Sequence, residues 1–142
     1  MVLLLDEKHI ETIVRQSERA FPIEACGVLM GTVKTRIRVV KSVEAAENAA
    51  NSSCSYKIAP EELYRILTSG EERGESIVGF YHSHPSCEAE LSKLDLELAS
   101  FPKISYLIYS VRDRVLKSYI WTGRTFKKER ITVSKRKMTV ND

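Results

Sequence analysis

The sequence predicts a single mixed α+β domain in which helices interrupt a largely antiparallel sheet. Its 142 residues, 43% hydrophobic and 29% charged, are typical of one globular domain and exclude a disordered or fibrous protein. Segments with apolar residues at helical spacing alternate with short apolar runs of strand length. The chain after residue 103 predicts three successive strands, with a hairpin turn at Gly123-Arg124 between the last two.

Helices are predicted from residues that favour their first turns. Asp6 can cap a first helix, which Pro22 ends. Pro60 suits the first turn of a second helix, and Ser92 can cap a third. The expected helices are 6–20, 60–73 and 92–100.

Strands are predicted for apolar runs that are flanked on each side by turn or loop residues. The run Cys26–Met30 stops at Gly31, and residues 33–43 alternate basic and apolar side chains, as in a half-exposed strand. The small and polar residues of 44–53 indicate a loop. The further expected strands are 56–58, 76–83, 104–110, 115–122 and 125–133.

The charge of the chain is unevenly distributed. The formal net charge is +3, yet residues 124–142 alone carry +5, which leaves −2 on residues 1–123. A basic end can bind nucleic acid. We expect an exposed strand and a mobile tail instead, because no aromatic residue follows Phe126 and no nucleic-acid-binding motif is present. The expected division is a folded domain over 1–134 and a basic tail over 135–142.

Hydrophobic runs and cysteines narrow the class of protein further. Every apolar run is far shorter than the roughly 20 residues that span a bilayer, and Val2–Leu5 is too short for the core of a signal peptide. We therefore expect a cytoplasmic protein without membrane contact. The cysteines Cys26, Cys54 and Cys87 include no C-x-x-C pair, which argues against a disulfide framework and a zinc ribbon.

Two of the three histidines lie two residues apart, at His82 and His84, where Pro85 ends an expected strand. Residues i and i+2 of a strand point to the same face, so both imidazoles face one point. Asp95 follows, three residues after Ser92. Two imidazoles and one carboxylate are a ligand set of catalytic zinc, with water in the fourth position. The histidine pair and the Ser92–Asp95 pair each also have a purely structural explanation, since histidines occur in ordinary strands and S-x-x-D is a common capping pattern.

Taken as a unit, residues 82–95 resemble the JAMM (or MPN+) motif of zinc-dependent isopeptidases, H-x-H-P-x(6)-S-x-x-D, at every fixed position. Glu24–Gly31 is similar to the second landmark of that family, a glutamate ahead of a strand, with the pattern E-x-C-G-x-L-x-G. The resemblance covers roughly residues 4–121. It implies an MPN/JAMM-type catalytic domain, a curved, largely antiparallel sheet flanked by helices in a cytidine-deaminase-like arrangement.

The resemblance implies a role for each residue of the motif. His82, His84 and Asp95 would hold one Zn²⁺ per chain, and the metal lowers the pKa of its bound water toward ~7. Glu24 would take the proton of that water and pass it to the leaving amine. Ser92 would hydrogen-bond the oxyanion of the tetrahedral intermediate, unless its hydroxyl caps the helix instead.

Neighbouring residues receive other interpretations. Ser83, between the two histidines, should face the packing and have no catalytic role. Cys87 has three possible roles: a fourth zinc ligand that quenches activity, one half of a disulfide with Cys54, or an ordinary loop thiol, which we favour. Cys26 is expected to be a small buried residue, and His9 an exposed one on the first helix.

The implied reaction is hydrolysis of the bond after the C-terminal Gly-Gly of ubiquitin or a ubiquitin-like modifier, in conjugates or precursors. Only eight residues, 96–103, separate Asp95 from the next expected strand, so the chain resembles the compact bacterial and archaeal branch. Tyr81–Pro85 also resembles the proteasome-lid deubiquitinase. The implied partners are conjugates of ubiquitin-like proteins, with the proteasome and sulfur-carrier proteins as further candidates, and a monomer or weak dimer is expected. Two alternatives remain: a modifier-tail binding module with quenched activity, and processing of a ubiquitin-like sulfur carrier.

Overall fold

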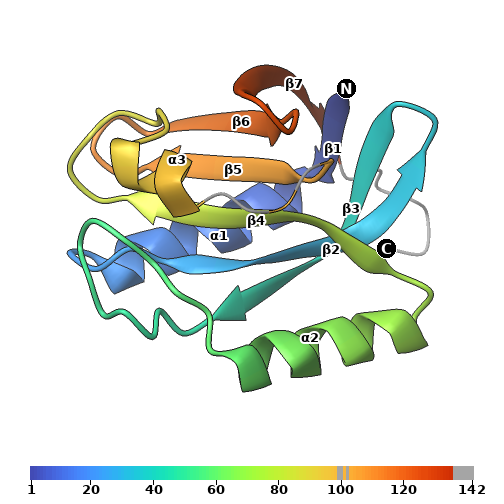
Figure 1. Ribbon diagram of the computed structural model, residues 1–142, viewed down its shortest axis with the longest axis horizontal. Coiled ribbons are helices and arrows are strands. Elements are labelled where there is room, and N and C mark those ends of the chain that lie inside the picture. Colours follow the sequence, from blue (N-terminus) through green and yellow to red (C-terminus); the bar gives the residue numbers. More distant parts are fainter. Residues whose placement is uncertain (99–100, 102, 136–142) are drawn as a thin grey trace.

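A curved sheet closed into a barrel forms the body of the molecule (Figure 1). The computed structural model describes residues 1–98, 101 and 103–135. Of the basic tail expected over 135–142, only Lys135 lies within the described residues. The elements are β1 (Val2–Asp6), α1 (Glu7–Ala20), β2 (Cys26–Lys34), β3 (Ile37–Ala46), α2 (Pro60–Glu72), β4 (Ser76–His84), α3 (Lys93–Leu98), β5 (Ser105–Ser110), β6 (Val115–Trp121) and β7 (Phe126–Ser134).

The sheet is mixed, with antiparallel pairing prominent as predicted. The strand order is β1-β3-β2-β4-β5-β6-β7. β2 pairs antiparallel with β3 and β4, and β6 pairs antiparallel with β5 and β7. β4 is parallel to β5, and β1 closes the barrel because it is parallel to both β3 and β7. The sequence patterns do not predict β1, since its apolar residues Val2–Leu5 show no alternation with polar ones.

Two hydrophobic clusters lie on opposite faces of the central strands. On β4, Tyr81 packs in a cluster with Ile13 of α1, whereas its neighbour Phe80 packs in a second cluster with Ile66 of α2. Successive residues of a strand point to opposite faces, which separates the two clusters. His82 continues the Phe80 face, so the end of β4 presents its histidine on the same side of the sheet as α2.

The β2–β3 hairpin differs from the prediction. β2 does not stop at Gly31 but continues to Lys34, with a register shift between Met30 and Gly31. A Cβ at position 31 would collide with the carbonyl oxygen of Val39, so this glycine serves a close approach of two strands instead of ending one. The turn falls at Thr35, whose φ is 59°, inside the segment expected to be one strand. Residues 56–58, expected to be a strand, belong to the loop that connects β3 and α2.

Helix α1 begins at the predicted cap. The side chain of Asp6 accepts a hydrogen bond from the backbone N–H of Lys8, and Nδ1 of His9 accepts one from the N–H of Asp6 at 3.0 Å. This capping box folds His9 back onto the barrel, where the residue is only 8% exposed. The expectation of an exposed histidine is therefore wrong, and burial lowers the pKa of this side chain.

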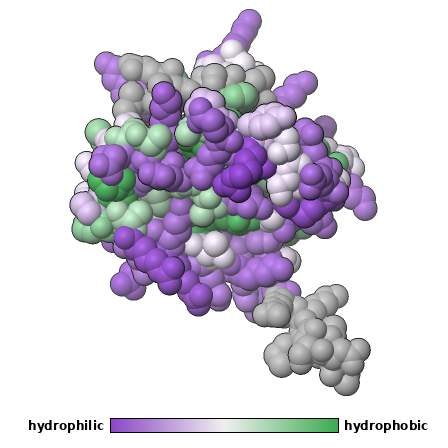
Figure 2. Space-filling view, turned by 90° about the horizontal axis from the view of Figure 1, so that it is seen from below, coloured by the Kyte–Doolittle hydropathy of each residue, from purple (hydrophilic) through white to green (hydrophobic). Residues whose placement is uncertain are grey.

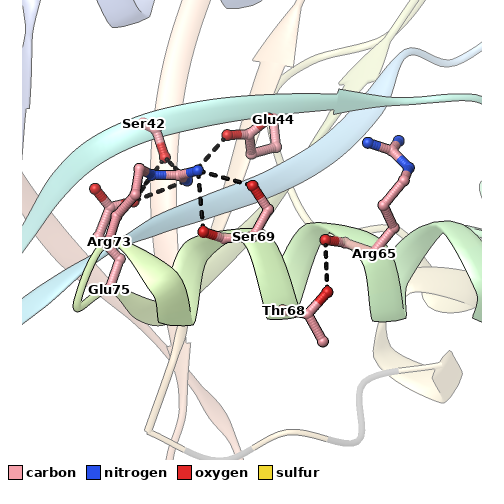
Figure 3. A network of polar contacts seen from close by, with 7 residues as sticks. All are labelled: Ser42, Glu44, Arg65, Thr68, Ser69, Arg73 and Glu75. Atoms are coloured by element: carbon pink, nitrogen blue, oxygen red, sulfur yellow. Dashed lines mark hydrogen bonds and ion pairs between the residues drawn. The ribbon is translucent and has the colours of Figure 1, made fainter.

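The C-terminal end of α2 is fastened to β3 by Arg73 (Figure 3). Its Nη2 lies 3.2 Å from a carboxylate oxygen of Glu44 and 3.2 Å from the hydroxyl of Ser42, and Nη1 donates to the hydroxyl of Ser69 at 2.9 Å. Exposed pairs of this kind each add little stability. Together these contacts link the C-terminal end of α2 to β3.

The surface on the α2 side is largely hydrophilic. Figure 2, which views the molecule from below Figure 1, shows polar residues over most of this face and smaller hydrophobic areas between them. No helix in the described ranges is both long and apolar enough to cross a membrane.

Candidate metal centre

Three side chains of the predicted motif meet at the end of β4. His82 and His84 are alternate residues at the C-terminal end of that strand, so their side chains point to the same face, as expected. They are 2% and 3% exposed, respectively. Asp95 lies in the first turn of α3. Figure 1 shows α3 and the β3–α2 loop at the same end of β4.

The distances among these three side chains fit a bound metal. Nε2 of His82 lies 3.2 Å from Nε2 of His84, and the Asp95 carboxylate lies 3.3 Å from the first nitrogen and 3.1 Å from the second. Tetrahedral zinc with bonds of about 2.0–2.1 Å separates its ligand atoms by about 3.3 Å. Within the described part of the chain, these residues form the group of candidate ligands whose atoms all lie within 4.8 Å of one another.

A backbone carbonyl sets the orientation of His84. Nδ1 of its ring lies 2.8 Å from the carbonyl oxygen of Glu88, so Nδ1 carries the proton and donates it. The neutral ring then presents the Nε2 lone pair to the centre of the group, which is the form that ligates a metal. The donor set and its orientation therefore fit zinc.

Ser92 and Asp95 hold each other at the start of α3. The N–H of Ser92 donates to Oδ2 of Asp95 at 2.9 Å, and the N–H of Asp95 donates to the Ser92 hydroxyl at 3.0 Å. The hydroxyl thus makes the capping contact that the sequence left as an alternative to an oxyanion role. Because it accepts in this contact, its own proton remains free to donate elsewhere.

The charges within the group support one another. Burial opposes ionisation of Asp95, but the contacts from His82 and His84 outweigh it and hold the pKa of this carboxyl well below its usual range. Burial likewise lowers the pKa of His84, yet its contacts with Asp95 and the Glu88 carbonyl outweigh burial and raise that pKa. A fixed negative charge is therefore present beside the two imidazoles, as a cation site requires.

Glu24 lies beside this group, just before β2, the strand that pairs with β4. The β2–β4 register pairs Cys26 with His82, and Glu24, two residues before Cys26, is close enough for its charge to interact with those of the three side chains. The residue is 2% exposed, and its Oε1 has no hydrogen-bond partner among the described residues. Burial raises the pKa of Glu24 to about 7. A carboxyl with such a pKa can both accept and release a proton near neutral pH.

Ser83 faces away from the metal group, as predicted. It is fully buried, its hydroxyl accepts the N–H of Ala25 at 2.8 Å, and its own N–H donates to the carbonyl of Ala25 at 2.9 Å. These bonds tie β4 to the residue that follows Glu24. Ser83 thus joins β4 to the segment that carries Glu24.

A steric reason explains Gly27 of the E-x-C-G pattern. A Cβ at this position would collide with the ring of Tyr81. The Tyr81 hydroxyl donates to Gln16 of α1, and Nε2 of Gln16 donates to the carbonyl of Cys26 at 2.9 Å. The glycine therefore leaves room for the Tyr81 ring, and Gln16 of α1 can contact both β2 and β4 next to the site.

The cysteines take no part in the group. All three are free, so the disulfide considered between Cys54 and Cys87 is not formed. Cys54 and Cys87 are exposed, and Cys87 is not among the converging ligand atoms, which leaves it an ordinary loop thiol. Cys26 is buried, as expected, and burial raises the pKa of its thiol to about 12.

Two residues next to the site were not identified from the sequence. The ring of Tyr56 stacks on the imidazole of His82, with centroids 4.7 Å apart and planes at 22°. The side-chain amide of Asn48 donates to the carbonyl of Glu24 at 3.0 Å. Both lie in the β3–α2 loop, whose irregular sequence carries no periodic signal.

The sequence of the chain is similar to a known protein family and to named relatives. The family model described as prokaryotic homologs of the JAB domain matches residues 6–122. A desampylase of Haloferax volcanii is 39% identical over 113 residues, 79% of each chain. A CysO-cysteine peptidase of Mycobacterium tuberculosis is 32% identical over 112 residues, 79% of this chain and 75% of the relative.

Two solved structures share the fold of the chain. The solution structure of a Desulfitobacterium hafniense protein matches with a TM-score of 0.88 at 29% identity, covering 94% of both chains. A second, from Salinibacter ruber, matches with a TM-score of 0.72 at 30% identity, covering 92% of this chain and 90% of the other. From the matched residues and the motif they contain, the chain belongs to the prokaryotic branch of the JAB (JAMM/MPN) family.

Proposed function

We propose that the chain is a zinc-dependent peptidase that cleaves the bond after the C-terminal Gly-Gly of a ubiquitin-like modifier. The observation that carries this proposal is the pairing of a converging His-His-Asp group with the buried carboxyl group of Glu24, whose Oε1 has no hydrogen-bond partner among the described residues. A structural histidine cluster has no need of that second acid. The relatives named desampylase and CysO-cysteine peptidase support the class of reaction.

His82, His84 and Asp95 hold the metal in this proposal. Zn²⁺ bound there would supply a Lewis acid and a water with a pKa lowered toward ~7. Glu24 accepts the proton of the attacking water at its carboxylate and then delivers it to the leaving amine. In the metal-free protein, burial raises the pKa of this carboxyl to about 7.

Ser92 stabilises the developing negative charge in the same scheme. Its hydroxyl accepts the N–H of Asp95 and keeps a proton to donate to the oxygen of the scissile carbonyl. The short contact with Asp95 holds the hydroxyl in place before the reaction. The cap and the oxyanion contact are therefore compatible, because they use different parts of one hydroxyl.

The substrate class follows from the relatives. The name desampylase describes an enzyme that removes a ubiquitin-like protein, and the name CysO-cysteine peptidase describes an enzyme that acts on a sulfur carrier. Both share a ubiquitin-like protein as the acyl side of the bond, which is the substrate class we assign. Processing of a sulfur carrier is the second candidate, favoured by the 32% identity to the CysO-cysteine peptidase.

Other expectations stay predictions. They are a cytoplasmic location, a monomer or weak dimer, and association with the proteasome. A binding module with quenched activity is less favoured, because Cys87, the residue considered for quenching, is not among the converging ligand atoms.

The test combines zinc content with hydrolysis. The purified chain is incubated with a ubiquitin-fold domain that ends in Gly-Gly and is linked to a lysine amine, with and without a chelator. We expect one zinc per chain and release after Gly-Gly that the chelator abolishes and added zinc restores. Cleavage that survives removal of all zinc would overturn the mechanism, and a metal-free protein that takes up no zinc would overturn the site.

A further inference from the structure

We propose that Asn48 and Tyr56 are positioning residues, through which the β3–α2 loop (residues 47–59) holds both the proton-transfer group Glu24 and the metal ligand His82. This inference rests on the proposed function. It assigns to one loop two tasks that neither strand of the site performs.

Asn48 organises the loop with its whole side-chain amide. Nδ2 donates to the carbonyls of Glu24 and Ser55, each at 3.0 Å, and Oδ1 accepts the N–H groups of Ala50 at 3.0 Å and Lys57 at 3.1 Å. A carboxamide has two N–H donors and two acceptor lone pairs, so all four are used. No residue that offers only donors or only acceptors reproduces this set.

The loop holds the backbone of Glu24 on both sides. The carbonyl of Glu24 accepts from Asn48, and its N–H donates to the carbonyl of Ser52 at 2.9 Å. Glu24 precedes β2, so the sheet ladder does not fix these two groups. Its Oε1 has no partner among the described residues, which leaves the direction of the carboxylate dependent on the backbone that carries it.

Tyr56 does for His82 what a hydrogen bond does for His84. Nδ1 of His84 bonds to the Glu88 carbonyl, whereas Nδ1 of His82 is buried without a partner among the described residues. The ring of His82 instead lies against Tyr56 at a centroid distance of 4.7 Å. Stacking therefore restrains the plane of the ligand that lacks a second hydrogen bond.

The two tasks are coupled through one short piece of chain. Asn48 accepts the N–H of Lys57, the residue after Tyr56, and the N–H of Ala49 donates to the carbonyl of Lys57 at 2.8 Å. These bonds close the loop directly beside Tyr56. The asparagine that holds Glu24 thus also fixes where the tyrosine ring lies.

Asn48→Asp tests the first task. The variant keeps an acceptor for Ala50 and Lys57 but sets an oxygen against the carbonyls of Glu24 and Ser55. We expect kcat to fall by roughly 10- to 100-fold while zinc affinity stays that of the wild type. Asn51→Asp is the matched control, since it adds the same charge to the same loop at an exposed residue whose side chain has no part in this set.

A second readout of Asn48 does not depend on hydrolysis. Deuterium exchange at the Glu24 amide reports its bond to Ser52 directly, and Asn48→Asp should speed this exchange while Asn51→Asp leaves it unchanged. Asn48→Ala, which removes the bonds without repulsion, replaces Asn48→Asp if that variant does not fold.

Tyr56→Leu tests the second task by competition for zinc with a chelator. We expect zinc affinity to fall by roughly 10- to 100-fold, with Tyr56→Phe, which keeps the stacked ring, close to wild type. Equal zinc affinity in Tyr56→Leu, or wild-type kcat and exchange in Asn48→Asp, would overturn the inference. A lower melting temperature with these readouts unchanged would also overturn it, because the loop would then be structural only. If the wild type itself binds zinc without cleaving the fusion, the proposed function fails, while exchange and zinc affinity still decide the roles of the loop.

Discussion

Arg38 of β3 and Glu129 of β7 form an ion pair at 3.5 Å, with both side chains only 2% exposed. The strand β1 lies between their strands in the barrel, so the pair reaches across the strand that closes it. Arg38 also donates from Nε and Nη2 to the carbonyl of Lys103 at 2.9 and 2.6 Å, and the Ser118 hydroxyl donates to Glu129 at 2.6 Å. Because the charges are satisfied from several sides, their burial is tolerated.

Removal of one partner of this pair should destabilise the fold. We expect Glu129→Ala to lower the free energy of unfolding by about 3–5 kcal/mol, since it leaves a buried guanidinium without its counter-charge. Arg65→Ala, which removes an exposed pair with Glu62 at 3.4 Å, should cost no more than about 1 kcal/mol. Urea unfolding of both variants measures the difference, and equal losses would contradict the role of burial.

Glu24→Gln should abolish hydrolysis and leave zinc bound. The amide keeps the size of the side chain but does not take the proton of the attacking water. Turnover of the Gly-Gly fusion and zinc content are measured on the same preparation. Turnover near that of the wild type would remove Glu24 as the proton acceptor, whereas loss of zinc would make it a structural part of the metal group.

The same substitution should change the pH dependence of stability in the metal-free protein. Burial raises the pKa of Glu24 from 4.5 to about 7, so between these values the folded state keeps a proton that the unfolded state loses. Stability of the wild type therefore falls as pH rises through this window, by on the order of 3 kcal/mol from this group. Unfolding of wild type and Glu24→Gln from pH 4 to 8 measures the difference between them. A difference that does not change with pH would refute the raised pKa.

Ser92→Ala should separate the two uses of its hydroxyl. Loss of the cap on α3 costs about 1 kcal/mol of stability, and loss of an oxyanion donor lowers kcat by about 10²- to 10³-fold. Ser92→Thr keeps the hydroxyl and should retain most of both. If melting shows the expected loss in Ser92→Ala while kcat per zinc-loaded chain is unchanged, the hydroxyl is a cap only.

The convergence of His82, His84 and Asp95, a candidate metal site, was predictable from the sequence because each half of the group is local. Residues two apart on a strand share a face, which brings His82 and His84 together whatever the rest of the fold does. The Ser92–Asp95 box is equally local, since it is closed within one helical turn. The spacing of the JAMM motif then predicted that the two histidines and the Ser92–Asp95 pair belong to one site. Glu24 came from the resemblance of the segment Glu24–Gly31, not from any property of a lone glutamate.

The surroundings of the group were decided by tertiary structure. Asn48 and Tyr56 reach Glu24 and His82 from an irregular loop, and their contacts depend on how that loop folds back over the sheet. The burial of His9 likewise depends on where the barrel lies relative to the start of α1.

The sequence by itself determined the helices and most of the strands, because backbone periodicity encodes them, and it determined that His82 and His84 share a face, because the two residues are close in the chain. The class of chemistry came from the resemblance to the JAMM family. Only the tertiary structure decided that Val2–Asp6 is a strand, that it closes the sheet into a barrel, and that Arg38 meets Glu129 inside it. These pairings join residues 35 to 128 positions apart. Their stability comes from burial that the whole chain creates together, and no local pattern of residues carries that information.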